Sequence, residues 1–258
     1  MTENASLRRL ISRLKFRVDG VEVPRILLGT SPFVGAGQFG ARSMQYYWRF
    51  YMNPENIVDL VCASAELGVV GIQLLSEDVL LRAVRRAEER LGFRFTVVAT
   101  VGPGSPIDGV RKMLGFQTVA MLVHGGITDR RSKRVLSKIL DEIRSHGCLA
   151  GIATHEPSRT LRWMMEADLD VDMVMLPMNK RGRFMDAPPE EIADLVKALG
   201  KPAIGKKVLA AGAIPPEEAI EYVASLGCID AVALGVTSRE EAVEAFTAAA
   251  RILSEQEP

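Results

Sequence analysis

The sequence predicts an α/β domain of the (β/α)8 TIM-barrel class, with eight parallel strands in a closed ring and a helix after each strand. Short runs of Val, Ile, Leu and Ala alternate eight times with longer amphipathic segments. The short runs are apolar throughout, as expected for strands covered by helices outside and filled by side chains inside. The length of 258 residues suits one such barrel, whereas a doubly wound sheet usually has fewer strands.

The elements follow one another in a regular order. Residues 14–25 alternate in polarity around Asp19-Gly20, a strong β-hairpin signal, and we expect this hairpin to close the bottom of the barrel. The predicted strand and helix pairs are 25–30 with 54–67, 69–75 with 77–91, 94–102 with 106–114, 118–125 with 129–146, 148–154 with 157–167, 171–179 with 188–199, 201–209 with 215–226, and 229–236 with 238–253. A single domain therefore spans residues 1–258.

The connection between the first strand and the first helix, residues 30–53, is unusually long, and loops of that length tend to be functional. Its stretch QYYWRFYMN, residues 45–53, concentrates large rings around one arginine. The residues of interest are Tyr46, Tyr47, Trp48, Arg49 and Tyr51. We expect a lid or binding wall for a substrate, and the alternative is a homo-oligomer interface, where the same residue types concentrate.

Composition narrows the classes of partner. The 32 basic and 32 acidic side chains cancel, which disfavours nucleic acid and membrane surfaces. No long apolar run and no apolar leader segment are present, so we expect a cytoplasmic protein that binds a small molecule. The three Cys are widely spaced, which disfavours disulfides and structural zinc. Arg outnumbers Lys while Asn and Gln are scarce, which favours a thermophilic source.

Active sites of such barrels lie at the carboxyl ends of the strands, so polar residues there are the catalytic candidates. His124 follows an apolar strand and precedes two glycines, and its imidazole can act as an acid or donate a hydrogen bond to a carbonyl oxygen. His155 and Glu77 also follow strands. The alternative for each histidine is a structural role, and a metal held by these groups is disfavoured, so no metal is predicted.

Lys206 and Lys207 are consecutive on a predicted strand, and we expect them to face opposite sides of it. A lysine pointing into a barrel is costly unless it is paired. The inward lysine is therefore a candidate for binding an anion or forming a Schiff base, and the alternative is a buried ion pair. With His124, His155 and Glu77, Lys207 completes the predicted catalytic set.

The last unit offers a phosphate site. In VALGVTSREEA, residues 232–242, Ser238 and Glu241 form a capping box, and Arg239 lies beside the helix start. The GAGQFG motif at residues 35–40 matches the dinucleotide fingerprint GxGxxG only in letters, because no helix opens within it.

Two long segments resemble the aldo-keto reductase superfamily. Residues 201–246, KPAIGKKVLAAGAIPPEEAIEYVASLGCIDAVALGVTSREEAVEAF, are similar to the final two units of that family. Residues 150–179, AGIATHEPSRTLRWMMEADLDVDMVMLPMN, resemble its fifth and sixth strands, and the hairpin followed by PRILLGTSPF also fits. The resemblance implies the barrel fold and hydride transfer between NADPH and a carbonyl.

The family's catalytic tetrad of Asp, Tyr, Lys and His is largely missing. The resemblance places His124 at the tetrad histidine, but Val101 stands where the lysine is expected, and neither the Asp nor the Tyr follows GIQLLSEDVLL. Ala153 replaces the serine that contacts the nicotinamide amide, and Met178 replaces the ring that stacks on it.

The resemblance implies NADP as cofactor, and an oxidoreductase acting on a small carbonyl compound. The residues it assigns to cofactor binding are Thr154, Asn179, Lys206, Gly235, Thr237, Ser238 and Arg239. The missing tetrad groups leave an alternative. In this alternative the protein is not a reductase: the barrel binds a small anionic or aromatic ligand, or it catalyses a lyase or hydrolase reaction at the same strand-end site.

Overall fold

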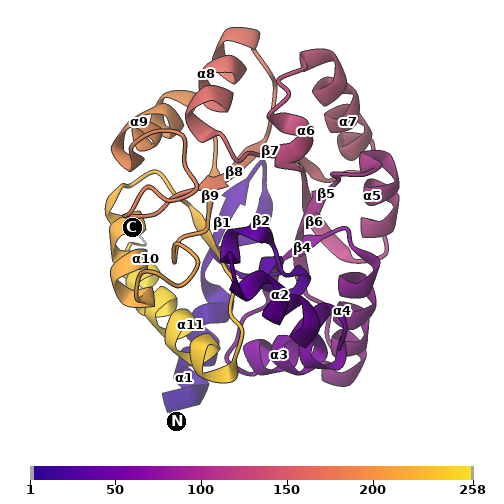
Figure 1. The fold of residues 1–258 in the computed structure, drawn as a ribbon, viewed down its shortest axis with the longest axis vertical. Helices are drawn as coiled ribbons and strands as arrows, with labels where there is room; N and C mark the ends of the chain where they lie inside the picture. Colours follow the sequence, from indigo (N-terminus) through magenta and orange to yellow (C-terminus); the bar gives the residue numbers. More distant parts are fainter. Residues whose placement is uncertain (1–2, 257–258) are drawn as a thin grey trace.

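Eight parallel strands close into a barrel in a computed structural model that describes residues 3–256 (Figure 1). Strands consecutive in sequence are neighbours, and β10 pairs with β3 to complete the ring. The strands are β3 (Ile26–Gly29), β4 (Gly71–Leu75), β5 (Thr96–Val101), β6 (Gln117–Val123), β7 (Leu149–Ala153), β8 (Met173–Pro177), β9 (Ala203–Lys206) and β10 (Ala231–Leu234). The predicted fold class is confirmed.

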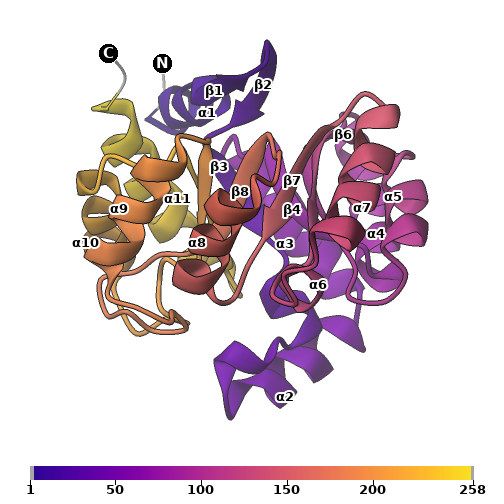
Figure 2. The same ribbon diagram turned by 90° about the horizontal axis from the view of Figure 1, so that it is seen from above.

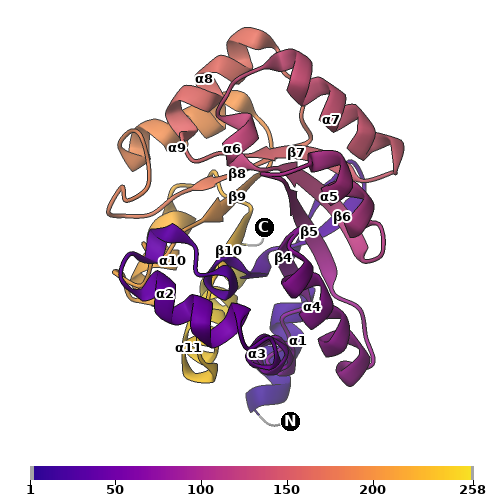
Figure 3. The ribbon, with the colours of Figure 1, turned by 45° about the vertical axis from the view of Figure 1, so that its right-hand side comes forward.

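All eight predicted outer helices are present and surround the strands (Figure 3). They are α3 (Glu55–Glu66), α4 (Asp78–Leu91), α5 (Pro106–Met113), α7 (Lys133–Ser145), α8 (Pro157–Ala167), α9 (Pro189–Leu199), α10 (Pro216–Ser225) and α11 (Arg239–Ser254). Each buries its apolar stripe against the strands, as amphipathic helices of a barrel must. A further short helix, α6 (Gly125–Thr128), follows β6 directly.

The predicted hairpin consists of β1 (Lys15–Val18) and β2 (Val21–Pro24), paired antiparallel. Asp19 and Gly20 both have positive φ, 48° and 81°, as a tight two-residue turn requires. Val18 and Val23 pack against the side chains that fill the barrel. The hairpin therefore covers one end of the barrel, as expected from the sequence.

The structure adds a helix that the sequence did not predict, α1 (Glu3–Arg13), which packs against α11. Few side chains of α1 are buried, and Ile11 is one of them. Among residues 3–256, no helix combines the length and apolar character needed to cross a membrane.

The long connection after β3 is folded rather than irregular. It contains the turns η1 (Ser31–Val34) and η2 (Gly37–Phe39), the helix α2 (Arg42–Tyr46), and a π-helical turn, η3 (Tyr47–Tyr51). Phe50 is buried against Phe33, with ring centroids 5.2 Å apart. This unit and the β1–β2 hairpin lie at opposite ends of the barrel (Figure 2).

Candidate functional site

A cavity of about 780 Å³ opens at the carboxyl ends of the strands. Its floor is formed by strand-end side chains: Gln73, Thr100, Ala153, Met175, Lys206 and Ala233. Residues 31–46 form one wall, and residues 207–216, between β9 and α10, form another. The two walls touch where Arg42 Nη2 donates a hydrogen bond of 2.5 Å to the carbonyl oxygen of Ala211.

The four residues predicted to be catalytic all line this cavity: His124, Lys207, Glu77 and His155. Glu77, at the start of α4, and His155 are exposed, whereas His124 and Lys207 are half-buried. The barrel thus brings together residues that are far apart in the sequence, and their catalytic roles stay predictions.

Lys206 is the last residue of β9 and points inward. Ile204, two positions earlier, fills the barrel interior, and side chains alternate along a strand. Lys207 leaves the strand with φ 57°, a left-handed conformation, and also lines the cavity. The expectation that the two lysines face opposite sides is therefore wrong, because the strand alternation ends between them.

Neither lysine forms an ion pair or side-chain hydrogen bond within the part of the chain that the structure describes, so the alternative of a buried ion pair is not observed. Lys207 Nζ lies 5.0 Å from the ring centroid of Phe184. Burial, reinforced by the charge of Lys207, lowers the pKa of Lys206 from 10.5 to about 7. Burial also lowers the pKa of Lys207. Near neutral pH, much of Lys206 is therefore an uncharged amine, the nucleophilic form.

His124 caps the start of α6. Its Nδ1 accepts a hydrogen bond of 3.0 Å from the backbone N–H of Gly126, so the proton of the neutral ring resides on Nε2. Burial, together with the nearby charges of His155 and Lys206, lowers the pKa of His124 from 6.5 to about 4. At neutral pH the ring is uncharged and can donate a hydrogen bond from Nε2.

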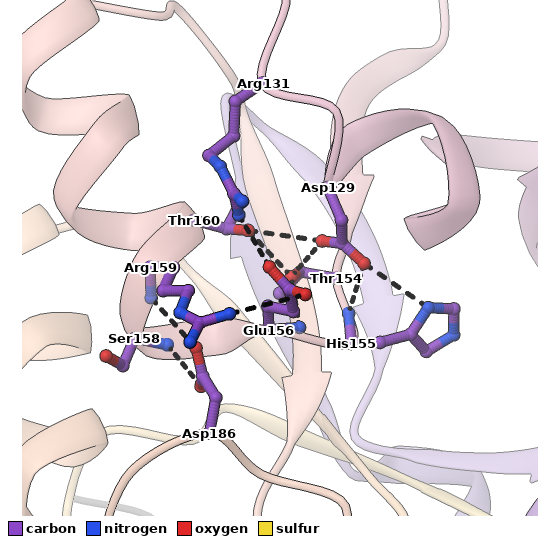
Figure 4. Close-up of polar contacts among 9 residues, drawn as sticks. All are labelled: Asp129, Arg131, Thr154, His155, Glu156, Ser158, Arg159, Thr160 and Asp186. Carbon is purple, nitrogen blue, oxygen red and sulfur yellow. Dashed lines mark hydrogen bonds and ion pairs between the residues drawn. The ribbon is translucent and has the colours of Figure 1, made fainter.

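Asp129, which follows α6, organises the other side of the site (Figure 4). Its carboxylate accepts hydrogen bonds from the Oγ1 atoms of Thr154 and Thr160, at 2.5 and 3.2 Å, and from the backbone N–H of His155 at 3.0 Å. Oδ2 lies 3.4 Å from His155 Nδ1. Burial alone acts to raise the pKa of Asp129, but the hydrogen bonds from His155 and Thr154 outweigh it and lower that pKa.

Asp129 is not among the residues predicted from the sequence, because it lies five residues beyond the strand-end His124 and not at a strand end. The available signal is the short HGGITD stretch, in which an acidic residue follows a strand-end histidine and two glycines. Between His124 and Asp129 the chain makes one helical turn, α6. This turn brings the Asp129 carboxylate to Thr154 and His155 at the end of β7.

Several residues assigned to NADP by the resemblance have their polar groups already engaged. Glu241 Oε2 accepts from the backbone N–H and Oγ1 of Thr237, at 2.7 and 2.9 Å. Ser238 Oγ accepts from Glu241 N–H at 3.2 Å, which is the serine half of the predicted capping box, whereas the Glu241 side chain bonds to Thr237 rather than to the Ser238 backbone. Arg239 points away to Glu66, 2.6 Å from its carboxylate. A carboxylate therefore occupies the helix start that was expected to hold phosphate.

The remaining members of that set divide into two groups. Lys206 and Gly235 line the cavity, as does Thr237. Thr154 is buried on Asp129, and Asn179 is buried with both amide atoms bonded to the backbone of Arg183, at 2.9 and 3.1 Å. This arrangement does not fit the phosphates of a dinucleotide in the expected place.

Of the aromatic stretch, only Tyr46 lines the cavity. Tyr47 stacks on Tyr51 with centroids 4.9 Å apart, and Trp48 has 58% of its surface exposed. Tyr47, Trp48, Arg49 and Tyr51 lie outside the cavity lining, so contact between these four and a substrate stays a prediction, as does a homo-oligomer interface. The cavity wall comes instead from the first half of the connection.

No group of three or more His, Cys, Asp and Glu side chains within residues 3–256 is arranged to hold a metal ion.

Comparisons with known proteins agree on the fold. No family model matches the chain, and no curated protein matches it in sequence. A structure from Pseudomonas aeruginosa, provisionally assigned as an aldo-keto reductase, is similar over 96% of this chain and 99% of its own, at 20% identity and TM-score 0.67. An aldo-keto reductase from Brucella melitensis covers 93% and 97%, at 11% identity and TM-score 0.63.

The similarity extends beyond reductases. A truncated 3-deoxy-D-arabino-heptulosonate 7-phosphate synthase from Thermotoga maritima covers 93% of this chain and 89% of its own, at 12% identity and TM-score 0.53. The chain thus shares the fold of the aldo-keto reductases, as its sequence predicted, and barrels of other chemistry resemble it too.

Proposed function

We propose that this protein is an enzyme that binds a small carbonyl compound as a covalent imine on Lys206. One observation carries the proposal: a lysine at the floor of a cavity, without an acidic partner among residues 3–256 and with a pKa of about 7. A lysine that only stabilises the fold is expected to pair with an acid, whereas an imine-forming lysine needs a neutral amine in a desolvated site beside another cation. Lys207 is that second cation.

The residues around Lys206 suit the chemical steps. The Lys206 nitrogen attacks the carbonyl carbon, a C–N bond forms, and the C=O double bond becomes a C–OH group. His124 donates from Nε2 to the oxygen as negative charge develops there, which lowers the barrier. The oxygen then leaves as water with one proton lost by the amine and one taken from solvent, and a protonated imine remains.

The cavity limits the class of substrate. Its volume of about 780 Å³ suits a small ligand. The lining carries the carboxylates of Glu77, Glu241 and Glu244 as well as Arg42, and the adjacent Lys206 and Lys207 at the end of β9 support an anionic group on the substrate. A small carbonyl compound with a carboxylate or phosphate therefore fits this site best.

The test is reductive trapping. The protein is incubated with pyruvate, dihydroxyacetone, dihydroxyacetone phosphate or acetaldehyde and then reduced with borohydride. We expect a covalent adduct on the peptide that contains Lys206, detected by mass spectrometry, and no adduct at that peptide in Lys206→Ala. Lys180→Ala is the matched control, since Lys180 is exposed and paired with Glu218, and it should trap as the wild type does. Equal trapping by Lys206→Ala would contradict the proposal.

A second candidate function is NADP(H)-linked reduction of a carbonyl in the same cavity. The fold shared with aldo-keto reductases and the neutral, hydrogen-donating His124 favour it. The engaged donors of Thr237 and Arg239 count against it. Titration with NADPH, followed by the fluorescence of the cofactor, separates the two candidates. A reductase requires saturable binding of NADPH, whereas imine formation on Lys206 does not.

A further inference from the structure

We infer that His155, held by Asp129, is the base that removes a proton from the carbon next to the imine. This inference rests on the proposed function and deepens it. It assigns the reaction to the class in which a bond at that carbon is made, broken or exchanged, and it requires a substrate with hydrogen on that carbon.

The two histidines of the cavity have complementary hydrogen-bonding roles. His124 uses Nδ1 to accept from Gly126, so only its Nε2–H remains to act in the cavity, as a donor. His155 directs Nδ1 at the Asp129 carboxylate, 3.4 Å away, an arrangement that favours the proton on Nδ1 and Nε2 as the acceptor. The rings lie edge to face with centroids 5.3 Å apart. One site thus holds both a donor and a base.

The carboxylate that orients His155 is itself fixed. Thr154 and Thr160 donate to Oδ1 of Asp129, and the backbone N–H of His155 donates to Oδ2 (Figure 4). A buried carboxylate with this many donors stays ionised and cannot rotate freely. Asp129 is therefore a positioning residue, and its charge offsets the positive charge that develops on His155.

Neighbouring acidic groups are committed elsewhere, which leaves His155 as the base on this side of the cavity. Glu156 pairs with Arg131 at 2.8 Å, and Asp186 accepts from the first backbone N–H groups of α8, at 2.9 and 3.1 Å (Figure 4). Glu77 lines the cavity from its exposed rim and is the competing candidate.

Gly125 shows that the position of the His155 ring is built into the fold. A Cβ added to Gly125 would stand 2.4 Å from His155 Nδ1 and 2.6 Å from Cε1. Only a residue without a side chain lets the ring lie between α6 and the cavity while it faces Asp129. The HGG sequence therefore serves both histidines, because Gly126 orients His124 and Gly125 makes room for His155.

The step balances without a further reactant. The C–H bond next to the protonated imine breaks, and its electron pair forms a C=C bond. The C=N bond becomes a single bond, so the Lys206 nitrogen is neutral in the resulting enamine. The proton moves to His155 Nε2. In the reverse direction it returns to the carbon, or an electrophile bonds to that carbon in its place.

The experiment measures hydrogen exchange and imine trapping in parallel. Pyruvate and dihydroxyacetone are incubated with the protein in deuterium oxide, and loss of the proton signal on the carbon next to the carbonyl is followed by NMR. We expect wild-type exchange to fall by roughly 100-fold or more in His155→Ala and His155→Gln, while borohydride trapping at Lys206 is retained. Added imidazole should restore part of the exchange in His155→Ala, as a structural role for the ring would not predict.

Three further variants sharpen the test. Gly125→Ala should lose exchange and keep trapping, because it displaces the ring without altering its chemistry. Asp129→Asn should also lose exchange and keep trapping. Added imidazole should not rescue this variant, since the His155 ring still fills the site. Glu77→Gln tests the competing carboxylate: loss of exchange in Glu77→Gln and not in the His155 variants would overturn the inference.

The two proposals fail in different ways. If trapping is seen and the His155 variants exchange at the wild-type rate, the base is wrong and the imine stands. If Lys206→Ala still exchanges while His155→Ala does not, the imine is wrong and the base stands. Absence of both trapping and exchange in the wild type with these probes would overturn both.

Discussion

At the scale of single residues, the site surrounds ionisable side chains with groups that disfavour their charged forms. This favours reactivity and lowers the stability of the fold. Lys206 is half-buried without an acidic partner among residues 3–256, and His124 lies beside two lysines and a second histidine. Removing such ionisable groups from water lowers the stability of the folded protein, and they cluster at functional sites. The cost should be measurable in the dependence of stability on pH.

Lys206→Met should stabilise the protein at neutral pH. The pKa of Lys206 is about 7 in the folded protein and near 10.5 when unfolded, so between these values the unfolded chain binds more protons. Wild-type stability should therefore rise from pH 7 towards 10.5, and the variant should gain at most about 4 kcal/mol at pH 7. Urea unfolding near neutral pH and again near pH 10 measures the gain, which should shrink at the higher pH. An equal gain at both values would contradict the expectation.

His124→Asn should reduce the loss of stability in acid. The pKa of His124 is about 4 in the folded protein against 6.5 unfolded, so its contribution is fully present above 6.5 and is lost as pH falls towards 4. The loss in the wild type is at most about 3 kcal/mol. Asparagine can still accept from Gly126, so the local turn should persist. Thermal melts between these pH values would show a flatter profile in the variant, and an unchanged profile would count against a buried neutral His124.

At the scale of elements, the connection between β3 and α3 works as a folded unit. Gly35, with φ 59°, lets η1 approach α2 closely, since an added Cβ would stand 2.5 Å from Ser43 O and 2.9 Å from Tyr47 Cβ. Arg42 then ties this unit to the segment after β9. The wall of the cavity is stable only while both attachments hold.

Gly35→Ala should loosen this unit while the barrel stays folded. Strain at a left-handed position costs a non-glycine residue about 1–3 kcal/mol, and the close contacts add to it. Limited digestion with trypsin should cut after Arg42 or Arg49 roughly tenfold faster than in the wild type. Gly37→Ala is the matched control, because its added Cβ meets nothing within 4 Å. Equal cleavage of the two variants would show that the packing at Gly35 is unimportant.

At the scale of the whole molecule, the barrel is filled from one end and open to ligand at the other. Val18 and Val23 of the hairpin pack on Leu27, Val98 and other inward side chains. The cavity lies at the far end, so the hairpin contributes to stability and not to the site. The closed ring makes each part of this core depend on all the strands.

Val23→Ala should therefore destabilise the entire barrel. Val23 is fully buried, and the carbon atoms removed cost about 2 kcal/mol. Urea unfolding should show a lower midpoint with unchanged slope, because the same surface is exposed on unfolding. Val21→Ala, on the half-exposed side of the turn, should change the midpoint much less. A local transition confined to the hairpin would contradict this view.

Much of the fold was predictable because its signals are local. Apolar runs, amphipathic periods and the Asp19-Gly20 turn each report on a few adjacent residues, and all eight strand–helix units follow from them. The helical turns within residues 31–51 were not predicted, because their aromatic side chains carry no regular period. Their conformation depends on packing, such as Phe50 on Phe33.

That a barrel forms, and that His124, His155, Glu77 and one inward lysine meet at one rim, could be predicted from the sequence, since strand ends converge in every such barrel. Which of these side chains lie in contact depends on the folded structure. The left-handed conformation of Lys207 turns its side chain towards the cavity, and Asp129 reaches His155 from the end of α6. Both depend on backbone angles and on contacts across the fold, which no local pattern in the chain encodes.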